Sequence, residues 1–271
     1  RIRQIDPAIQ NEAHRLVEDC MIAANRCAAD FLRQQGRGLF IQHPGLRADR
    51  TDNIRALLKA HAPELADVDP ATPEGFRRLM QHTDPADAEL PVKAVISRQM
   101  ARAELAFEPA PHQGMGLDVY TTFTSPLRKF SDLYVHRLLR DRLWQQPARE
   151  LSDAQLEQLR ATQIRARQAA NALENWLRCD FARQLPDQPM AGTISRTVPA
   201  GFFVRLDANG LEGFISCKSL EGKYSFDPIT LRLIGKQRHF QVEQPVTVRP
   251  AGVDDERKQI LFSLVEDTEG H

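Results

Sequence analysis

The pattern of apolar and polar positions first predicts a long amphipathic helix over residues 6–35. Apolar side chains recur there every three or four positions, which indicates one core-facing stripe. Asp6 is a suitable N-cap, Pro7 suits the first helical position, and Gly36 is a typical stop signal. The predicted stripe consists of Ile9, Ala13, Leu16, Cys20, Ala24, Cys27 and Phe31. A second, polar stripe consists of His14, Glu18 and Asn25. The pattern alone leaves this second stripe open as a solvated face or a binding face.

The region that follows alternates short strands and helices. A short strand is expected over residues 37–43, and two more surround a Pro/Gly loop between residues 105 and 124. Helices are expected near residues 50–61, 73–82 and 92–102, from Ser125 onward, and from Ser152 to about Leu185. The apolar side of the last helix consists of Leu156, Leu159, Ile164, Leu173, Trp176, Leu177 and Phe181.

The pattern of apolar and polar residues changes near residue 188. From Gly192 onward, short alternating segments are separated by Gly, Asn and Pro, with one longer excursion over residues 217–241. Five short strands of this kind are typical of a small OB-type barrel. We therefore expect an α+β chain, with a mostly helical part over residues 1–187 and a five-stranded β-barrel over residues 188–271.

Composition and charge narrow the class of protein. The chain is 42% hydrophobic and 27% charged, which is ordinary for a soluble globular protein. Lys plus Arg and Asp plus Glu each number 36, so a nucleic-acid partner would have to be bound by a local basic patch. No apolar run is long enough to span a bilayer, and the four cysteines form no metal-ligand cluster. We expect a cytoplasmic protein with reduced, buried thiols and no membrane partner.

The stretch TTFTSPLRKFSDLYVHR, residues 121–137, carries the candidate chemistry. Ser125 can cap a helix and Pro126 fits its first position, so unpaired backbone N–H groups would make an anion site there. Arg128 would lie in that first turn, and its planar guanidinium suits a phosphate. Helical spacing puts three side chains on one face, where neighbours can pair: Arg128, Asp132 and His136. A plain charged helix face is the alternative that this pattern leaves open.

This stretch closely resembles the signature of the ribonuclease II family. The matching positions are Tyr120, Phe123, Thr124, Ser125, Pro126, Arg128, Lys129, Phe130, Asp132, His136 and Arg137. The first helix, in AHRLVEDCMIAAN (residues 13–25), also resembles the family, and the C-terminal barrel resembles its S1 RNA-binding domain. Within the family, bacterial ribonuclease II looks closest. The mostly helical part would then be half of an RNB catalytic domain.

The resemblance implies a processive 3′→5′ exoribonuclease that hydrolyses single-stranded RNA and releases nucleoside 5′-monophosphates. Magnesium held by aspartates would activate water in such a site. Arg128 would be catalytic, beside the scissile phosphate. The residues expected to contact RNA are His14, Glu18, Asn25, Tyr120, Thr124, Ser125, Lys129, Phe203, Lys218 and Arg257. The residues expected to support the site are Asp132, His136 and Arg137.

The chain departs from the family pattern in its metal ligands. The family's Asp-rich motif lies upstream of the first helix, and neither Asp pair of this sequence, in residues 66–70 and 253–258, has the right spacing. We expect the C-terminal part of a longer enzyme that is monomeric when complete, with its magnesium ligands in the missing N-terminal part. The chain by itself would be inactive. The alternative is an inactive family relative that acts as an RNA-binding or protein-interaction module.

The barrel departs from the pattern as well. Phe203 matches the aromatic on which such barrels stack bases, but Ala200 and Ser216 replace other expected contact residues. Phe202 and Phe214 are expected in the barrel core. The predicted phosphate contacts are Lys218, Lys223, Arg232, Lys236, Arg238, Arg257 and Lys258. His112, in the Pro/Gly loop near the signature, is a weaker candidate for a substrate contact.

Overall fold

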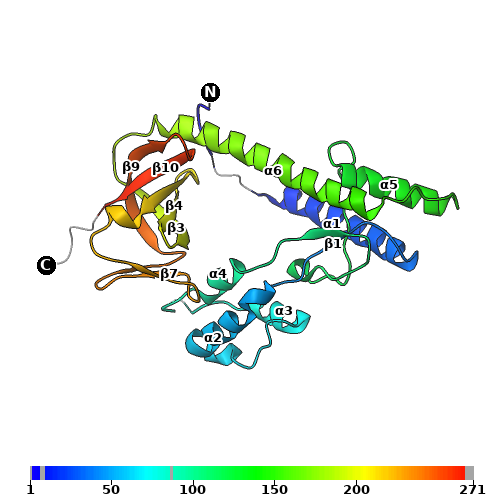
Figure 1. Cartoon of the computed structure of the whole chain (residues 1–271), viewed down its shortest axis with the longest axis horizontal. Coiled ribbons are helices and arrows are strands. Elements are labelled where there is room, and N and C mark those ends of the chain that lie inside the picture. The colour runs from blue at the N-terminus through cyan, green and yellow to red at the C-terminus, as the bar shows by residue number, and fades with distance from the viewer. Residues whose placement is uncertain (1, 7–9, 86–87, 266–271) are drawn as a thin grey trace.

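The computed structural model describes residues 2–6, 10–85 and 88–265. A helical N-terminal part is followed by a β-barrel, as the sequence predicts (Figure 1). The α-helices are α1 (Glu12–Gln34), α2 (Thr51–His61), α3 (Pro73–Gln81), α4 (Val92–Ser97), α5 (Phe130–Leu143) and α6 (Asp153–Ala182). The strands are β1 (Phe40–Gln42), β2 (Glu104–Ala106), β3 (Met190–Val198), β4 (Gly201–Leu206), β5 (Glu212–Ser216), β6 (Ser225–Asp227), β7 (Arg232–Ile234), β8 (His239–Phe240), β9 (Pro245–Asp254) and β10 (Gln259–Leu264).

Helix α1 begins later than predicted. Its N-cap is Asn11, whose side chain accepts a hydrogen bond from the His14 backbone N–H at 2.9 Å. The His14 ring nitrogen Nδ1 accepts the Asn11 backbone N–H in return at 3.4 Å. This reciprocal cap satisfies N–H groups that would otherwise be unpaired. The predicted cap at Asp6 is therefore wrong, and Pro7 lies outside the described residues.

Helix α1 also packs through a different face from the predicted one. Its buried residues are Asn25, Ala28, Ala29 and Leu32. Leu16 is 65% exposed, and the thiols of Cys20 and Cys27 are exposed rather than buried. Both faces carry apolar side chains, so periodicity alone could not decide which one meets the core. The small side chains of Ala28 and Ala29 lie on the face that packs.

The helical part contains two separate cores. One joins α1, the β1–β2 pair, α5 and the start of α6, and the two strands pair antiparallel. The other joins α2, α3 and α4. Helix α4 ends at Ser97, five residues before the predicted end. The second strand predicted before residue 124 does not form, although the Tyr120 carbonyl accepts the Ile41 N–H at 2.8 Å.

The C-terminal part is the predicted five-stranded barrel. Its strand order is β10-β5-β4-β3-β9, and parallel pairing of β10 with β5 closes it. Alternating residues fill the interior, among them Ile194, Phe202 and Val204, all fully buried. The excursion between β5 and β9 folds into a separate three-stranded sheet, β6-β7-β8. Closure leaves this barrel without the free edges that an open sheet exposes.

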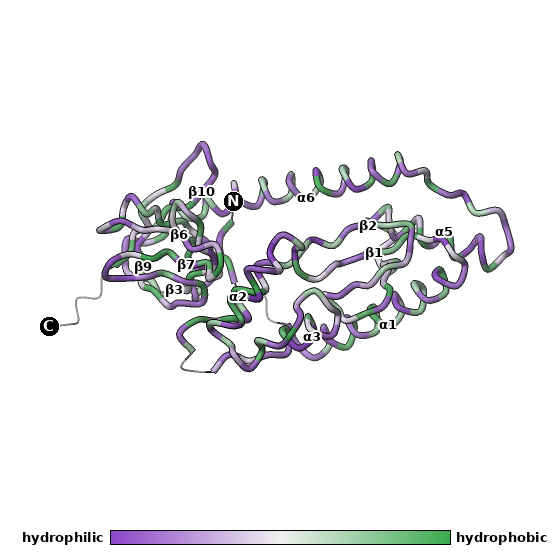
Figure 2. Tube along the Cα trace, turned by 60° about the horizontal axis from the view of Figure 1, so that its bottom comes forward, coloured by the Kyte–Doolittle hydropathy of each residue, from purple (hydrophilic) through white to green (hydrophobic). Residues whose placement is uncertain are grey.

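Helix α6, which is 30 residues long, connects the helical part to the barrel (Figure 1). It starts where predicted, with Ser152 capping the first turn. Its buried residues lie at its ends: Leu156 in the helical part, and Cys179 and Ala182 against the barrel core. Figure 2 shows hydrophilic and hydrophobic turns alternating along its length. The predicted apolar side is nevertheless not packed in the middle, where Ile164, Leu173 and Trp176 are exposed.

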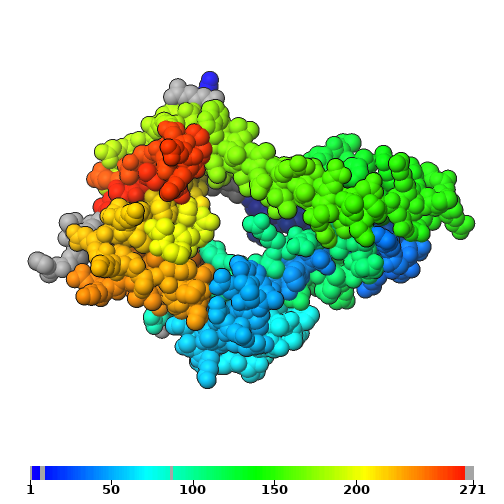
Figure 3. All heavy atoms as spheres, in the orientation of Figure 1, coloured from blue at the N-terminus to red at the C-terminus, as the bar shows by residue number. Residues whose placement is uncertain are grey.

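A second connection joins the barrel to the α2–α4 lobe. The buried Arg232 guanidinium in β7 donates from Nη1 to the Glu89 carboxylate at 3.0 Å, from Nη2 to the Glu89 backbone oxygen, and from Nε to Gln241 at 2.6 Å. Val242 completes the contact, since it packs into the α2–α4 core. The predicted phosphate contact at Arg232 is therefore wrong. Figure 3 shows the result, an opening enclosed by the barrel, α6 and the helical part.

Candidate functional site

The loop of residues 120–129, here called the signature loop, leads into α5. The predicted helix start at Ser125 is wrong, because α5 begins at Phe130 and its N-cap, Lys129, contributes no side-chain cap. Residues 125–129 instead form a turn, in which the Lys129 N–H donates to the Ser125 oxygen at 3.0 Å. Arg128 therefore lies just ahead of the helix rather than in its first turn.

A buried carboxylate explains this turn. Asp132 is fully buried at the third position of α5 and accepts three hydrogen bonds. They come from Thr122 Oγ1 at 2.9 Å, the Ser125 backbone N–H at 3.0 Å and Ser131 Oγ at 3.1 Å. The positive end of the helix stabilises the charge. Because the Ser125 N–H is used in this way, Asp132 fixes the signature loop against the helix, as expected of a supporting residue.

Asn25 and Tyr120 hold the other side of the signature loop. The Asn25 amide donates from Nδ2 to the Tyr120 hydroxyl at 3.0 Å, and its Oδ1 accepts the Phe123 N–H at 3.1 Å. Both side chains are buried. Their polar groups are satisfied within the protein, so they support the loop from beneath. The prediction that they contact RNA does not fit this burial.

His136 gives the loop a third attachment, and Arg137 gives it none. His136 Nε2 donates to the Phe123 carbonyl oxygen at 2.6 Å, and the two rings lie 5.2 Å apart. This contact agrees with the predicted supporting role of His136. Arg137 is exposed, and among the described residues its side chain has no hydrogen-bond or ion-pair partner. The predicted supporting role of Arg137 therefore finds no contact in the structure.

These attachments leave Arg128 free on the surface. Arg128 is exposed, beside the fully exposed Leu127 and the half-exposed Phe130. The predicted pairing of Arg128 with Asp132 does not form. In the part of the chain that the structure describes, the Arg128 guanidinium has no side-chain partner. An unpaired guanidinium on a firmly held loop can bind an anion with little reorganisation.

The remaining predicted residues of the helical part lie at the surface or close to it. Thr124 and Ser125 are half-buried, and Lys129 is exposed. Glu18 is exposed on α1, where its carboxylate accepts a hydrogen bond from Gln10 at 2.8 Å. His14 is exposed too, but its ring serves the cap of α1.

His112 of the Pro/Gly loop lies next to Tyr120 and next to His43, the residue that follows β1. The rings of His43 and His112 lie 5.1 Å apart, and His112 meets the Tyr120 ring edge-on at 5.5 Å. His112 Nδ1 is buried without a partner among the described residues. Burial, and secondly the proximity of His43, lower the pKa of His112. His112 is half-buried against Tyr120 and its Nδ1 is enclosed, which weakens its candidacy as a substrate contact.

The barrel presents an aromatic platform on its outer surface. The half-buried ring of Phe203 lies 5.0 Å from that of Phe214, and the Arg196 guanidinium lies 4.0 Å above Phe203. The expected core position of Phe202 is confirmed, whereas that of Phe214 is wrong. Sequence reasoning missed Arg196. The strand register brings it opposite Phe203, but a bulge between Ile194 and Arg196 disturbs the alternation that would have revealed it.

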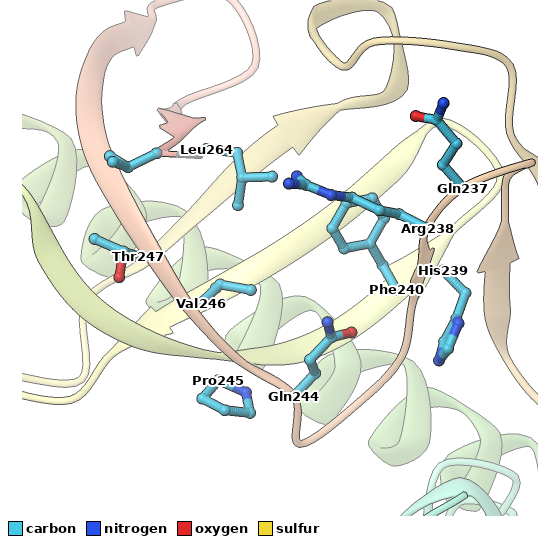
Figure 4. Close-up of a pocket in the computed structure, with 10 residues that line it drawn as sticks. Gln237, Arg238, His239, Phe240, Gln244, Pro245, Val246, Thr247 and Leu264 are labelled. Carbon is cyan, nitrogen blue, oxygen red and sulfur yellow. The ribbon is translucent and has the colours of Figure 1, made fainter. Parts of the chain in front are cut away.

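The predicted phosphate contacts of the barrel do not form one group. The parallel register of β5 and β10 places Lys218 and Arg257 beyond opposite ends of β5. Arg257 also lies 3.9 Å from the Asp254 carboxylate. A separate cavity of about 340 Å³ is lined by residues of β8, β9 and β10 and of the adjoining loops. Figure 4 shows these lining residues. Of the predicted phosphate contacts, the lining includes Arg238, which extends past Phe240 toward Leu264.

The described residues also bear on metals, membranes and thiols. Within residues 2–6, 10–85 and 88–265, no group of three or more His, Cys, Asp or Glu side chains could hold a metal ion. No helix in those ranges combines the length and apolar character needed to cross a bilayer. The four cysteines are free, but only Cys179 is buried as predicted; Cys20 and Cys27 are exposed, and Cys217 is half-buried.

Comparisons with known proteins agree with this architecture. The family profile described as RNB domain matches residues 1–145, and the profile described as S1 RNA binding domain matches residues 186–264. Ribonuclease R of Vibrio cholerae is 28% identical over 286 residues, covering 98% of this chain and 35% of that protein. Exoribonuclease 2 of Serratia proteamaculans is 36% identical over 211 residues, covering 75% of this chain and 32% of that protein. The chain thus spans about a third of the length of these curated relatives.

A solved structure shows the same fold. Mycoplasma genitalium RNase R, in complex with ribose methylated single-stranded RNA, matches with a TM-score of 0.72 at 20% identity. The match covers 95% of this chain and 42% of that one. The signature loop, the barrel with its aromatic platform and both family profiles lead to one conclusion: the chain belongs to the ribonuclease II/R family, with RNB and S1 domains.

Proposed function

We propose that this chain is the RNA-holding C-terminal part of an enzyme that degrades single-stranded RNA processively in the 3′→5′ direction. The enzyme hydrolyses phosphodiester bonds and releases nucleoside 5′-monophosphates. The observation that carries the proposal is the presentation of Arg128. Its guanidinium is exposed and unpaired within the described residues, while Asn25, Asp132 and His136 hold the loop beneath it.

Arg128 would act on the phosphate at the RNA 3′ end. A preorganised guanidinium can donate two parallel hydrogen bonds to phosphoryl oxygens and stabilise the charge that develops on them during hydrolysis. Glu18 and Lys129 are exposed and supply further contacts to the strand. Phe203 and Phe214 offer a surface on which bases stack without sequence preference. The barrel would therefore hold the strand while the signature loop holds its end.

The proposal includes magnesium as cofactor, with ligands in polypeptide outside this chain. Asp132, the aspartate closest to Arg128 in sequence, is fully buried and already accepts three hydrogen bonds. It is therefore not available as a metal ligand. Among the described residues, no group of three or more His, Cys, Asp or Glu side chains could hold a metal ion. The chain by itself would bind RNA without hydrolysing it.

The test uses the enzyme that contains this chain, 5′-labelled single-stranded RNA and magnesium. We expect stepwise shortening from the 3′ end, with nucleoside 5′-monophosphates as products. Arg128→Ala should reduce the cleavage rate by about 10²–10³-fold, as loss of a preorganised charge-stabilising group does, and leave RNA binding largely intact. The matched control is Arg77→Ala on α3, where an exposed arginine pairs with Glu74. Cleavage by Arg128→Ala at the unaltered rate would refute the assigned role.

A further inference from the structure

We propose that four arginines between the helical part and the barrel form a second anion site, which binds the phosphodiester backbone of single-stranded RNA. This site, here called the arginine cavity, rests on the proposed function and extends it to the path of the strand. The cavity has a volume of about 730 Å³ and lies between the two parts that enclose the opening in Figure 3. Its charged lining residues are Arg47, Arg98, Arg102, Arg196 and Glu104.

Three of the arginines share one rigid scaffold in the helical part. The segments that carry them pair antiparallel, with a bridge between Leu46 and Met100. The Arg47 N–H donates to the Gln99 oxygen at 3.1 Å, and the Ala101 N–H donates to the Gly45 oxygen at 2.9 Å. Backbone pairing of this kind fixes the positions of the Cα atoms that carry these side chains. The fourth arginine, Arg196, approaches from strand β3 of the barrel.

The charge of the cavity is not balanced from within. Arg47 pairs with Asp49 at 2.8 Å, and Arg98 lies 3.7 Å from the Glu243 carboxylate. Among the described residues, Arg102 and Arg196 have no carboxylate partner. With Asp49 and Glu243 counted beside Glu104, four arginines face three carboxylates, so the remaining positive charge of the cavity is carried by Arg102 and Arg196. Such a concavity attracts anions, and guanidinium groups match phosphate in shape.

Arg196 joins this cavity to the aromatic platform of the barrel. It lines the cavity and also lies 4.0 Å over the ring of Phe203. A base that displaces the Arg196 guanidinium from the face of Phe203 would leave this guanidinium beside the phosphate of the base, and the next phosphates would meet Arg102 and its neighbours. A free phosphate ion would use only part of this arrangement. The continuity of stacking surface and cationic cavity favours a polynucleotide strand as the ligand.

The test measures binding of the 271-residue chain to a fluorescein-labelled 12-nucleotide oligouridylate, by polarisation at several salt concentrations. The variants are Arg102→Gln, Arg196→Gln and the double change, and Arg77→Gln outside the cavity is the charge-matched control. Each lost phosphate contact should reduce the salt slope by about 0.7. The double variant should lose about 1.4 of slope and bind about tenfold more weakly, while its melting temperature and the control remain as in the wild type.

The possible outcomes separate this inference from the proposed function. In one outcome, the double variant binds RNA with the affinity and salt slope of the wild type, while Phe203→Ala binds more weakly. That result would refute RNA binding at the arginine cavity but not the proposed function. Failure of the wild-type chain to bind the oligouridylate at low salt would overturn the proposed function itself. Inorganic phosphate at constant ionic strength should not displace the RNA. Displacement by millimolar phosphate would show a free-phosphate site and contradict the strand proposal.

Discussion

Replacing the buried carboxylate of Asp132 tests the account of the signature loop most directly. In Asp132→Asn, the retained oxygen can still accept from Thr122 Oγ1 and Ser131 Oγ, which both bond to Oδ1. The new amide group then faces the Ser125 N–H, which bonds to Oδ2 at 3.0 Å. Two donors would meet, and one charge-assisted hydrogen bond would be lost.

The expected magnitude follows from these contacts. Losing a hydrogen bond to a buried charged acceptor costs about 1.5–3 kcal/mol, and losing the negative charge in the first turn of α5 adds about 0.3–1 kcal/mol. We therefore expect Asp132→Asn to lower the free energy of unfolding by about 2–4 kcal/mol. Asp132→Ala removes all three hydrogen bonds and should cost more than Asp132→Asn.

Urea unfolding followed by circular dichroism measures the global effect, and hydrogen exchange of the Ser125 amide measures the local one. Asp132→Asn should remove protection at Ser125 in particular. The matched control is Asp153→Asn, another first-turn aspartate, whose side chain is 94% exposed and only loosely paired with Arg37. If Asp132→Asn resembles this control in both measurements, the carboxylate does not hold the loop.

Two further predictions concern the contact of Arg232 with Glu89 and Gln241, and the titration of His112. Arg232→Met leaves the Gln241 side-chain oxygen without its donor, whereas the Glu89 carbonyl keeps the hydrogen bond from Gln241 Nε2 at 3.0 Å. The change should lower the free energy of unfolding, measured in urea, by about 1–3 kcal/mol; the same loss in Arg249→Met, an exposed pair, would contradict this. The pKa of His112 is lowered in the folded state from 6.5, so the unfolded chain binds that proton more readily, and stability should fall as pH drops below about 6.5. Melting temperatures between pH 7 and pH 5 should decline less steeply in His112→Phe, and an equal decline would refute the assignment.

The barrel and several helices could be read from the sequence because short-range signals determine them. Alternating residues between Gly, Asn and Pro turns specified the five barrel strands, and a Ser152–Gln155 capping box begins α6. Thr72 caps α3 in the same local way. In each case, the interactions that decide the element lie within a few residues of one another.

The errors arose where a contact other than the short-range signal decides the structure. A Ser-Pro pair is a good local helix start, but the carboxylate of Asp132 takes the Ser125 N–H and moves the start to Phe130. The burial of Asn25 follows from its contacts with residues almost a hundred positions away. The outward position of Phe214 depends on the barrel register. The sequence thus predicted the supporting residues Asp132 and His136, but it did not predict that Asn25 and Tyr120 support the loop as well.

The opening of Figure 3 is closed covalently through α6 and non-covalently through the contacts of Arg232 with Glu89, so it forms a closed frame. This closure has a topological consequence. A linear polymer can enter a closed frame only if one terminus is threaded through it, or if the frame breaks at its non-covalent joint. A circular RNA has no terminus, so its access would depend on breaking the contacts of Arg232 and Gln241 with Glu89 and the packing of Val242 into the α2–α4 core. The stability of this non-covalent contact would therefore determine how well the protein distinguishes linear from circular RNA, independently of any contact with a base.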